Sequence, residues 1–188
     1  ARGLRRRASA GAVSPGTGGP DRAAQEAAPP RAVPVVLCFL MRETPERGAE
    51  VLMGLKQTGF GIGRIVTLGG HVEPGETPAQ AAVREVFEES GVTVAEGDLD
   101  HAGTIEFVFP ARPEWDMSTV VFRARTWAGE PAPSAEIVPA WYPVDSVPYP
   151  QMWPDSAHWM PEVLAGRDFN AVVTLAADNE SVAGIVFS

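Results

Sequence analysis

The chain has 188 residues, of which 45% are hydrophobic and 21% are charged, and it contains a single cysteine. This length suits one domain with a real hydrophobic core plus a tail. A single cysteine excludes a framework of intrachain disulfides, and no stretch approaches the roughly 18 consecutive apolar residues of a membrane-spanning helix. With no anchor or secretory signal apparent, we expect a cytoplasmic protein without a membrane partner.

Charge is distributed unevenly along the chain. Residues 1–33 carry a net charge of +4, and the remaining residues carry −13. An acidic body disfavours a polynucleotide partner, because nucleic-acid binding needs a basic patch that neutralises phosphates. It allows a small phosphorylated ligand, because a divalent cation can lie between protein carboxylates and phosphate oxygens.

The first segment, residues 1–32, is rich in Arg, Ala, Pro and Gly and has almost no large apolar residues. Such a composition cannot bury enough surface to offset the entropy of ordering, so it predicts a disordered tail. A targeting or nucleic-acid-binding arm is the alternative. We expect the folded domain to span residues 33–188.

The domain is predicted to begin with two short apolar runs, 33–41 and 51–55, joined by a polar turn as a β-hairpin. Cys38 lies within the first run among apolar neighbours, which favours a small buried side chain over a nucleophile. A glycine-rich loop follows at 59–63 and leads to the pair at 69–70.

A helix is predicted over 77–90. Thr77 can cap its N-terminus, Pro78 suits its first position, and Gly91 lies just past its end. Its apolar residues are expected on one face and its acids largely on another; these apolar residues are Ala82, Val83, Val86 and Phe87.

The rest of the chain predicts strands and one more helix. The expected strands are 103–109, 119–126, 140–144, 171–175 and 182–187, and the helix is 156–164. Two helices flanking a mixed sheet make a layered α/β or α+β domain the expected fold class.

The helix at 77–90 carries the most informative cluster. Glu85, Glu88 and Glu89 stand at positions i, i+3 and i+4, so their carboxylates crowd together and repel unless something neutralises them. Oxygen ligands at this density suit Mg²⁺ or Mn²⁺ and not zinc. The carbonyl of Gly70 can add a backbone ligand. A solvated acidic face is the alternative for glutamates considered alone.

The spacing around this cluster resembles the Nudix box. Five residues separate Gly70 from Glu76, seven separate Glu76 from Arg84, and the run Arg84–Val92 reads Arg-Glu-aliphatic-x-Glu-Glu-x-Gly-aliphatic. The chain is thus similar to the Nudix hydrolases. The resemblance implies a Nudix α/β/α sandwich with a mixed β-sheet. It also implies metal-dependent hydrolysis of a nucleoside diphosphate linked to another moiety.

The resemblance also implies roles for single residues. Glu85, Glu88 and Glu89 would be the catalytic and metal-binding carboxylates, and Gly70 would be a carbonyl ligand of Mg²⁺ or Mn²⁺. Glu76 and Arg84 would form a buried structural pair that holds the loop to the helix. Glu136 matches an additional catalytic acid near the metals. The general base stays unassigned among the glutamates.

Further motifs resemble the MutT-homologue branch, the oxidised-purine nucleoside triphosphatases. The segment 152–155, Met-Trp-Pro-Asp, is the most specific of them. By this resemblance Trp153 stacks on the purine and Asp155 reads its edge, which is a sensible way to bind a flat polar base. The other implied substrate-binding residues are Lys56, Phe60 and Met117.

Two positions depart from the branch pattern. Val66 stands where the branch has an asparagine that bonds the base, and Ser156 stands where it has a second aspartate. The expected function is Mg²⁺-dependent pyrophosphohydrolysis of oxidised purine triphosphates such as 8-oxo-dGTP, a small-molecule substrate. Alternatives are a Nudix hydrolase of a canonical nucleotide, nucleotide sugar or dinucleotide, and a catalytically silent sensor domain.

Overall fold

The computed structural model describes residues 32–188. The expected disordered tail lies outside the described residues, apart from its last residue. Within 32–188 the chain forms eight strands and two α-helices: β1 (Val33–Thr44), β2 (Gly48–Lys56), β3 (Ile65–His71), α1 (Pro78–Ser90), β4 (Leu99–Val108), β5 (Met117–Ala124), β6 (Ile137–Pro143), α2 (Ser156–Leu164), β7 (Phe169–Leu175) and β8 (Val182–Phe187). No helix in this range is long and apolar enough to cross a bilayer.

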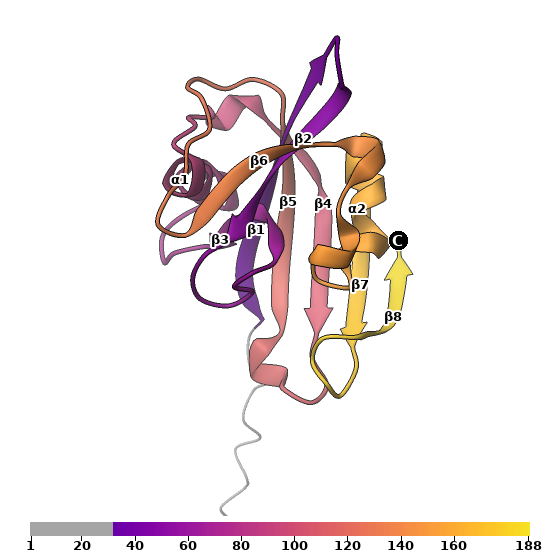
Figure 1. Ribbon diagram of the computed structural model, residues 1–188. Helices are drawn as coiled ribbons and strands as arrows, with labels where there is room; N and C mark the ends of the chain where they lie inside the picture. The colour runs from indigo at the N-terminus through magenta and orange to yellow at the C-terminus, as the bar shows by residue number, and fades with distance from the viewer. Residues whose placement is uncertain (1–31) are drawn as a thin grey trace, which may run out of the picture.

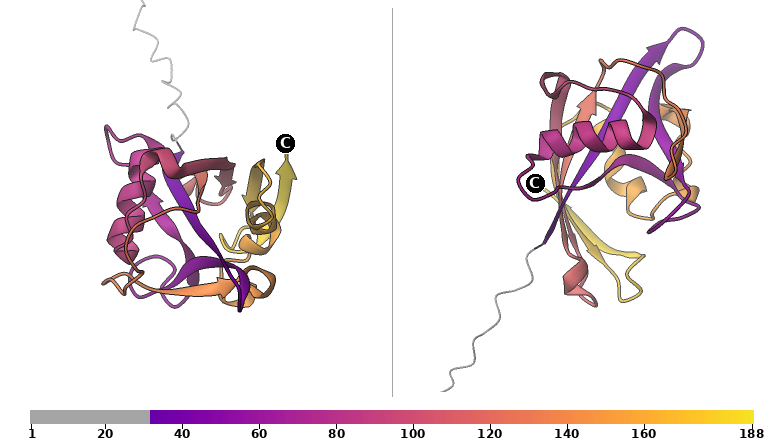
Figure 2. Two further views of the ribbon diagram at one scale, coloured as in Figure 1. Left: turned by 90° about the horizontal axis from the view of Figure 1, so that it is seen from above. Right: turned by 90° about the vertical axis from the view of Figure 1, so that its left-hand side faces the viewer.

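The strands form one mixed sheet in the order β6-β2-β3-β1-β5-β4-β7-β8 (Figure 1). The pairs β1–β5 and β4–β7 are parallel, and the other neighbouring pairs are antiparallel. Figure 2 shows α1 and α2 on opposite sides of the sheet. The layered architecture with a mixed sheet is therefore confirmed.

Alternation along β1 divides the core between the two faces of the sheet, since successive side chains of a strand point to opposite sides. Cys38 and Leu40 pack in the cluster under α1, whereas Phe39 and Met41 pack in the larger cluster that includes α2. Burial raises the pKa of the Cys38 thiol to about 12, because the thiolate would lose its solvation. This agrees with a small buried side chain and not with a nucleophile.

The helix α1 begins and ends as the sequence predicts. Thr77 caps it by accepting a hydrogen bond from the Gln80 backbone N–H, and Gly91 closes it in the left-handed conformation at φ 73°. The expected division of its faces is wrong at two residues. Phe87 is 56% exposed, and Glu89 is buried. Apolar and acidic side chains therefore do not separate cleanly on this helix.

Strand β3 was not expected, because the sequence there reads as a continuation of the glycine-rich loop. Its glycines are required by packing: a Cβ on Gly69 would lie 2.1 Å from the carbonyl oxygen of Val36 on β1. Strands β4 and β6 begin earlier than expected, at Leu99 and Ile137. β3 is important for the site because it places Gly69 and Gly70 next to the glutamates of α1.

Candidate active site

Arg84 ties the loop before α1 to the helix and to β3. Its Nε donates to Glu76 Oε1 at 2.7 Å, and its Nη2 donates both to Glu76 Oε2 at 3.1 Å and to the His71 carbonyl at 2.9 Å. The two bonds from Arg84 to Glu76, with one from the Glu73 N–H, lower the pKa of Glu76. The pair is not buried as expected: the side chains of Arg84 and Glu76 are 24% and 19% exposed.

The same guanidinium holds two of the clustered carboxylates. Arg84 Nη1 donates to Glu85 Oε1 at 2.8 Å and to Glu88 Oε2 at 3.1 Å. Arg84 thus contacts three glutamates, which offsets the repulsion between like charges one turn apart on the helix. Glu85 is largely covered, whereas the Glu88 side chain is 56% exposed.

Glu89 points away from this network. Its Oε2 accepts the Gly69 backbone N–H at 2.9 Å, and its Oε1 lies 3.4 Å from Lys56 Nζ. Burial raises the Glu89 pKa to about 7, because desolvation outweighs the stabilisation of the carboxylate by Gly69 and Lys56. Lys56 Nζ also donates to Glu136 Oε2 at 2.9 Å, so it joins α1 to the residue just before β6.

The donors near Gly70 fit a hard cation. A Cβ on Gly70 would lie 2.4 Å from Glu85 Oε1, so a larger residue here would displace this carboxylate from the backbone. The available donors are oxygens, as Mg²⁺ and Mn²⁺ prefer. Within residues 32–188 no three acidic, histidine or cysteine side chains already converge as a metal site. Glu85 and Glu88 are instead held by Arg84, and Glu89 by Gly69 and Lys56.

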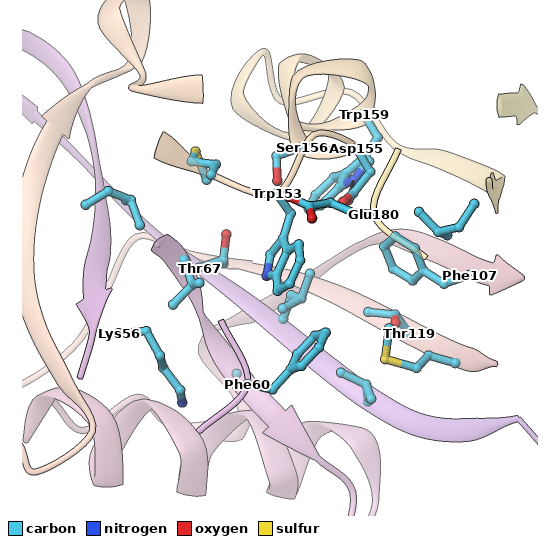
Figure 3. A pocket seen from close by; sticks show the side chains of 18 of the residues that line it. Lys56, Phe60, Thr67, Phe107, Thr119, Trp153, Asp155, Ser156, Trp159 and Glu180 are labelled. Atoms are coloured by element: carbon cyan, nitrogen blue, oxygen red, sulfur yellow. Dashed lines mark hydrogen bonds between the residues drawn. The ribbon is translucent and has the colours of Figure 1, made fainter. Parts of the chain in front are cut away.

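One cavity of about 230 Å³ connects this cluster to the start of α2 (Figure 3). Lys56, Gly69 and Glu89 line it near α1, and residues of the expected purine pocket line the remainder. Those residues are Phe60, Met117, Trp153 and Asp155, together with Val66 and Ser156 at the two departures from the branch pattern. Glu85, Glu88 and Glu136 do not line it.

Trp153 lies against the glycine-rich loop. Its ring stacks on Phe60, with the ring centres 4.7 Å apart and the planes 19° apart, and Arg64 Cζ lies 4.2 Å from its centre. Figure 3 shows the indole projecting toward Phe60, which is 68% exposed. Arg64 also donates to the Met152 carbonyl at 3.0 Å and pairs with Glu180. Sequence reasoning missed this positioning role of Arg64.

Asp155 is buried at the same end of the cavity as Trp153, at the N-terminus of α2. It accepts a hydrogen bond from Trp159 Nε1 at 2.8 Å. Burial raises the Asp155 pKa above its ordinary value, although the bond from Trp159 opposes the shift. A carboxyl in such surroundings is suited to hydrogen bonding with a neutral heterocycle.

Comparison with known proteins identifies a matching family and similar sequences. The NUDIX domain family model matches residues 31–163. The chain is 44% identical over 120 residues to the oxidized purine nucleoside triphosphate hydrolase of Danio rerio, which covers 64% of this chain and 75% of that protein. It is 40% identical over the same length, with the same coverage, to the protein of that name from Mus musculus.

The fold also matches solved structures. A MutT protein from Bacillus halodurans superposes with a TM-score of 0.70 at 22% identity, covering 83% of this chain and 97% of that one. At this identity the superposition concerns the fold alone. The family model covers well over half of the chain and includes the whole glycine, glutamate and arginine pattern of the site. The chain therefore belongs to the Nudix family.

Proposed function

We propose that this chain is a nucleoside triphosphate pyrophosphohydrolase that acts on oxidised purine nucleotides such as 8-oxo-dGTP with Mg²⁺ or Mn²⁺. Water would attack phosphorus and break the link between the α- and β-phosphates, giving the nucleoside monophosphate and pyrophosphate. The observation that carries the proposal is one cavity that has Glu89 and Lys56 at one end and Trp153 and Asp155 at the other. The names of the Danio rerio and Mus musculus relatives support the substrate class.

The carboxylate end would bind the phosphates. Glu85, Glu88, Glu89 and the Gly70 carbonyl would hold the cation, which supplies neutralisation of phosphate charge and acidification of a water molecule. Arg84 orients Glu85 and Glu88 through its two hydrogen bonds from Nη1. Lys56 fixes Glu89 and Glu136 relative to each other.

The aromatic end would bind the base. Trp153 offers a stacking surface, and a base that stacks on its Phe60-facing side would take the place of the Phe60 ring. The sheet supplies an apolar floor that includes Leu37, Phe107 and Met117 and excludes water from the base. Asp155 would bond the polar edge. The cytoplasmic location stays a prediction.

A substrate panel tests this proposal. The chain with Mg²⁺ would be given 8-oxo-dGTP, dGTP, dATP, a nucleotide sugar, a dinucleoside polyphosphate and NADH, with products separated by chromatography. NADH belongs in the panel because the NAD-capped RNA hydrolase NudC of Pseudomonas aeruginosa is 36% identical over 104 residues, although these cover only 34% of that protein.

The proposal expects the highest kcat/KM for 8-oxo-dGTP, with the monophosphate and pyrophosphate as products. Preference for any of the last three substrates would overturn the substrate class while leaving Nudix chemistry intact. Binding without turnover of every compound would instead identify a sensor domain.

A further inference from the structure

Two buried polar atoms in the cavity have no hydrogen-bond partner. Among residues 32–188, the buried side-chain atoms without one are Glu50 Oε1, Thr119 Oγ1 and Asn179 Oδ1. Glu50 Oε1 is matched by an ion pair with Arg47 at 2.9 Å. The other two both line the cavity described above. Because buried polar atoms are almost always bonded, each of these two has hydrogen-bonding capacity left for a molecule that enters the cavity.

Thr119 lies in the apolar floor of this cavity. It is 1% exposed, and its partners across the sheet are Val35 on β1 and Ile105 on β4. Figure 3 shows it beside Phe107. A valine would fill the same shape without burying an unbonded hydroxyl, so packing alone does not account for threonine here.

Asn179 reaches the cavity from the turn between β7 and β8. Its φ of 58° makes it the one described residue other than glycine with a positive φ, a conformation that asparagine tolerates better than most residues. The next residue, Glu180, pairs with Arg64, whose guanidinium lies over Trp153. This connection fastens the turn to the aromatic end of the cavity and holds the Asn179 amide there.

We propose that Thr119 and Asn179 recognise the lactam edge of the substrate's base, where a carbonyl group adjoins a ring N–H. The Thr119 hydroxyl donates to the carbonyl oxygen, and Asn179 Oδ1 accepts the N–H. This inference rests on the proposed function and refines its specificity. The two residues supply polar contacts in a cavity where Val66 has none to offer. Guanine and 8-oxoguanine carry such an edge, whereas adenine does not.

The test uses a hydroxyl deletion and its matched variants. Thr119→Val should raise KM for 8-oxo-dGTP about fivefold to tenfold, the scale of one hydrogen bond, with a smaller change in kcat. KM for dATP should change less than KM for dGTP. Thr119→Ser keeps the hydroxyl and should keep KM, although the lost methyl lowers Tm. If Thr119 had only a structural role, KM would change with Tm. Thr119→Ser, the variant with the lower Tm, would then raise KM more than Thr119→Val does.

Two further variants sharpen the result. Thr104→Val makes the same change at a hydroxyl that bonds Asn170 outside the cavity, and it should not move KM. Asn179→Gly accepts the positive φ without the amide, so it should raise KM for dGTP while retaining the turn.

The possible outcomes distinguish failure of this inference from failure of the proposed function. If wild type hydrolyses purine triphosphates and both Thr119→Val and Asn179→Gly keep its KM values and its preference for dGTP over dATP, the inference is wrong and the proposed function stands. If wild type neither hydrolyses 8-oxo-dGTP or dGTP nor binds 8-oxo-dGMP or dGMP in calorimetry, both are wrong. Weakened binding of these monophosphates in both variants supports the inference without reference to turnover.

Discussion

Glu89 Oε2 accepts the backbone N–H of Gly69 at 2.9 Å, so a carboxyl on the buried side of α1 is bonded to the strand that begins the site. The bond orients the side chain without compensating for its burial. Desolvation raises the Glu89 pKa to about 7 despite this bond and the nearby Lys56. In the metal-free protein, ionisation of Glu89 therefore opposes folding.

This predicts how metal-free stability depends on pH. Because the Glu89 pKa is higher in the folded than in the unfolded chain, its contribution to stability falls as pH rises from about 4.5 to about 7 and then levels off. Glu89→Gln removes this contribution. In EDTA, the variant should melt several degrees above wild type at pH 8 and close to it at pH 4.5. Equal differences at the two pH values would contradict the buried position of Glu89.

Glutamate substitutions should separate catalysis from folding. Glu85→Gln, Glu88→Gln and Glu89→Gln should each lower kcat by about 100-fold or more, the scale of removing one group that stabilises developing charge. Circular dichroism should show an unchanged fold. Glu96→Gln, at an exposed residue beyond the helix, is the matched control and should retain activity. Near-wild-type turnover of all three variants would refute the site.

The sequence predicted the chemistry better than the surroundings in which it takes place. Helical spacing placed Glu85, Glu88 and Glu89 together, because a helix fixes which side chains share a turn. The resemblance to the Nudix box selected Gly70, Glu76 and Arg84. It could not predict that Glu89 is buried, since Gly69 and Lys56 come from other strands. The Gly69–Val36 approach likewise depends on strand pairing, so β3 looked like loop.

The proposed base pocket could also be predicted from the sequence only in part. A resemblance in a short segment found Trp153 and Asp155, which lie together at the start of α2. Local pattern gave no reason to select Thr119, because threonine is common in strands. Only the sheet register, which surrounds its hydroxyl with apolar neighbours, makes it unusual.

Arg84 donates two hydrogen bonds to Glu76, so replacing it should lower the stability of the protein. Arg84→Lys keeps the charge but loses the planar fork that also holds Glu85 and Glu88. We expect a Tm lower by a few degrees and a kcat lower by about 10-fold to 100-fold, as for residues that orient metal ligands. The control is Arg167→Lys, whose fork to Glu162 is exposed; its Tm should hardly change. Equal effects of the two variants would contradict the structural role.

Loss of the aromatic surface should weaken base binding. Trp153→Ala should raise KM for purine triphosphates about fivefold to 100-fold, since stacking is worth about 1–3 kcal/mol per base. Trp127 stacks on Trp141 outside the cavity, with ring centres 5.6 Å apart. Trp127→Ala should therefore leave KM for purine triphosphates unchanged, even where it lowers Tm. An unmoved KM in Trp153→Ala would remove this residue from the substrate site.

A substitution at Val66 tests whether the absence of an asparagine amide at this position limits selectivity for 8-oxo-dGTP over dGTP. It lines the cavity yet also packs partly against the cluster under α1, so an asparagine there must turn its amide toward the base to bond it. If it does, Val66→Asn should raise the ratio of 8-oxo-dGTP to dGTP turnover about fivefold, the scale of one added hydrogen bond.

The companion change, Ser156→Asp, is expected to behave differently. It places a second carboxyl beside Asp155, whose own pKa burial already raises. The added group must be buried too, so it should lower Tm before it adds selectivity.

Val138→Asn, at a 40% exposed position on β6, is the control for Val66→Asn and should leave the substrate ratio unchanged. An unchanged ratio in Val66→Asn, with wild-type stability, would show that position 66 does not face the base, and selectivity would then rest on the other groups in the cavity.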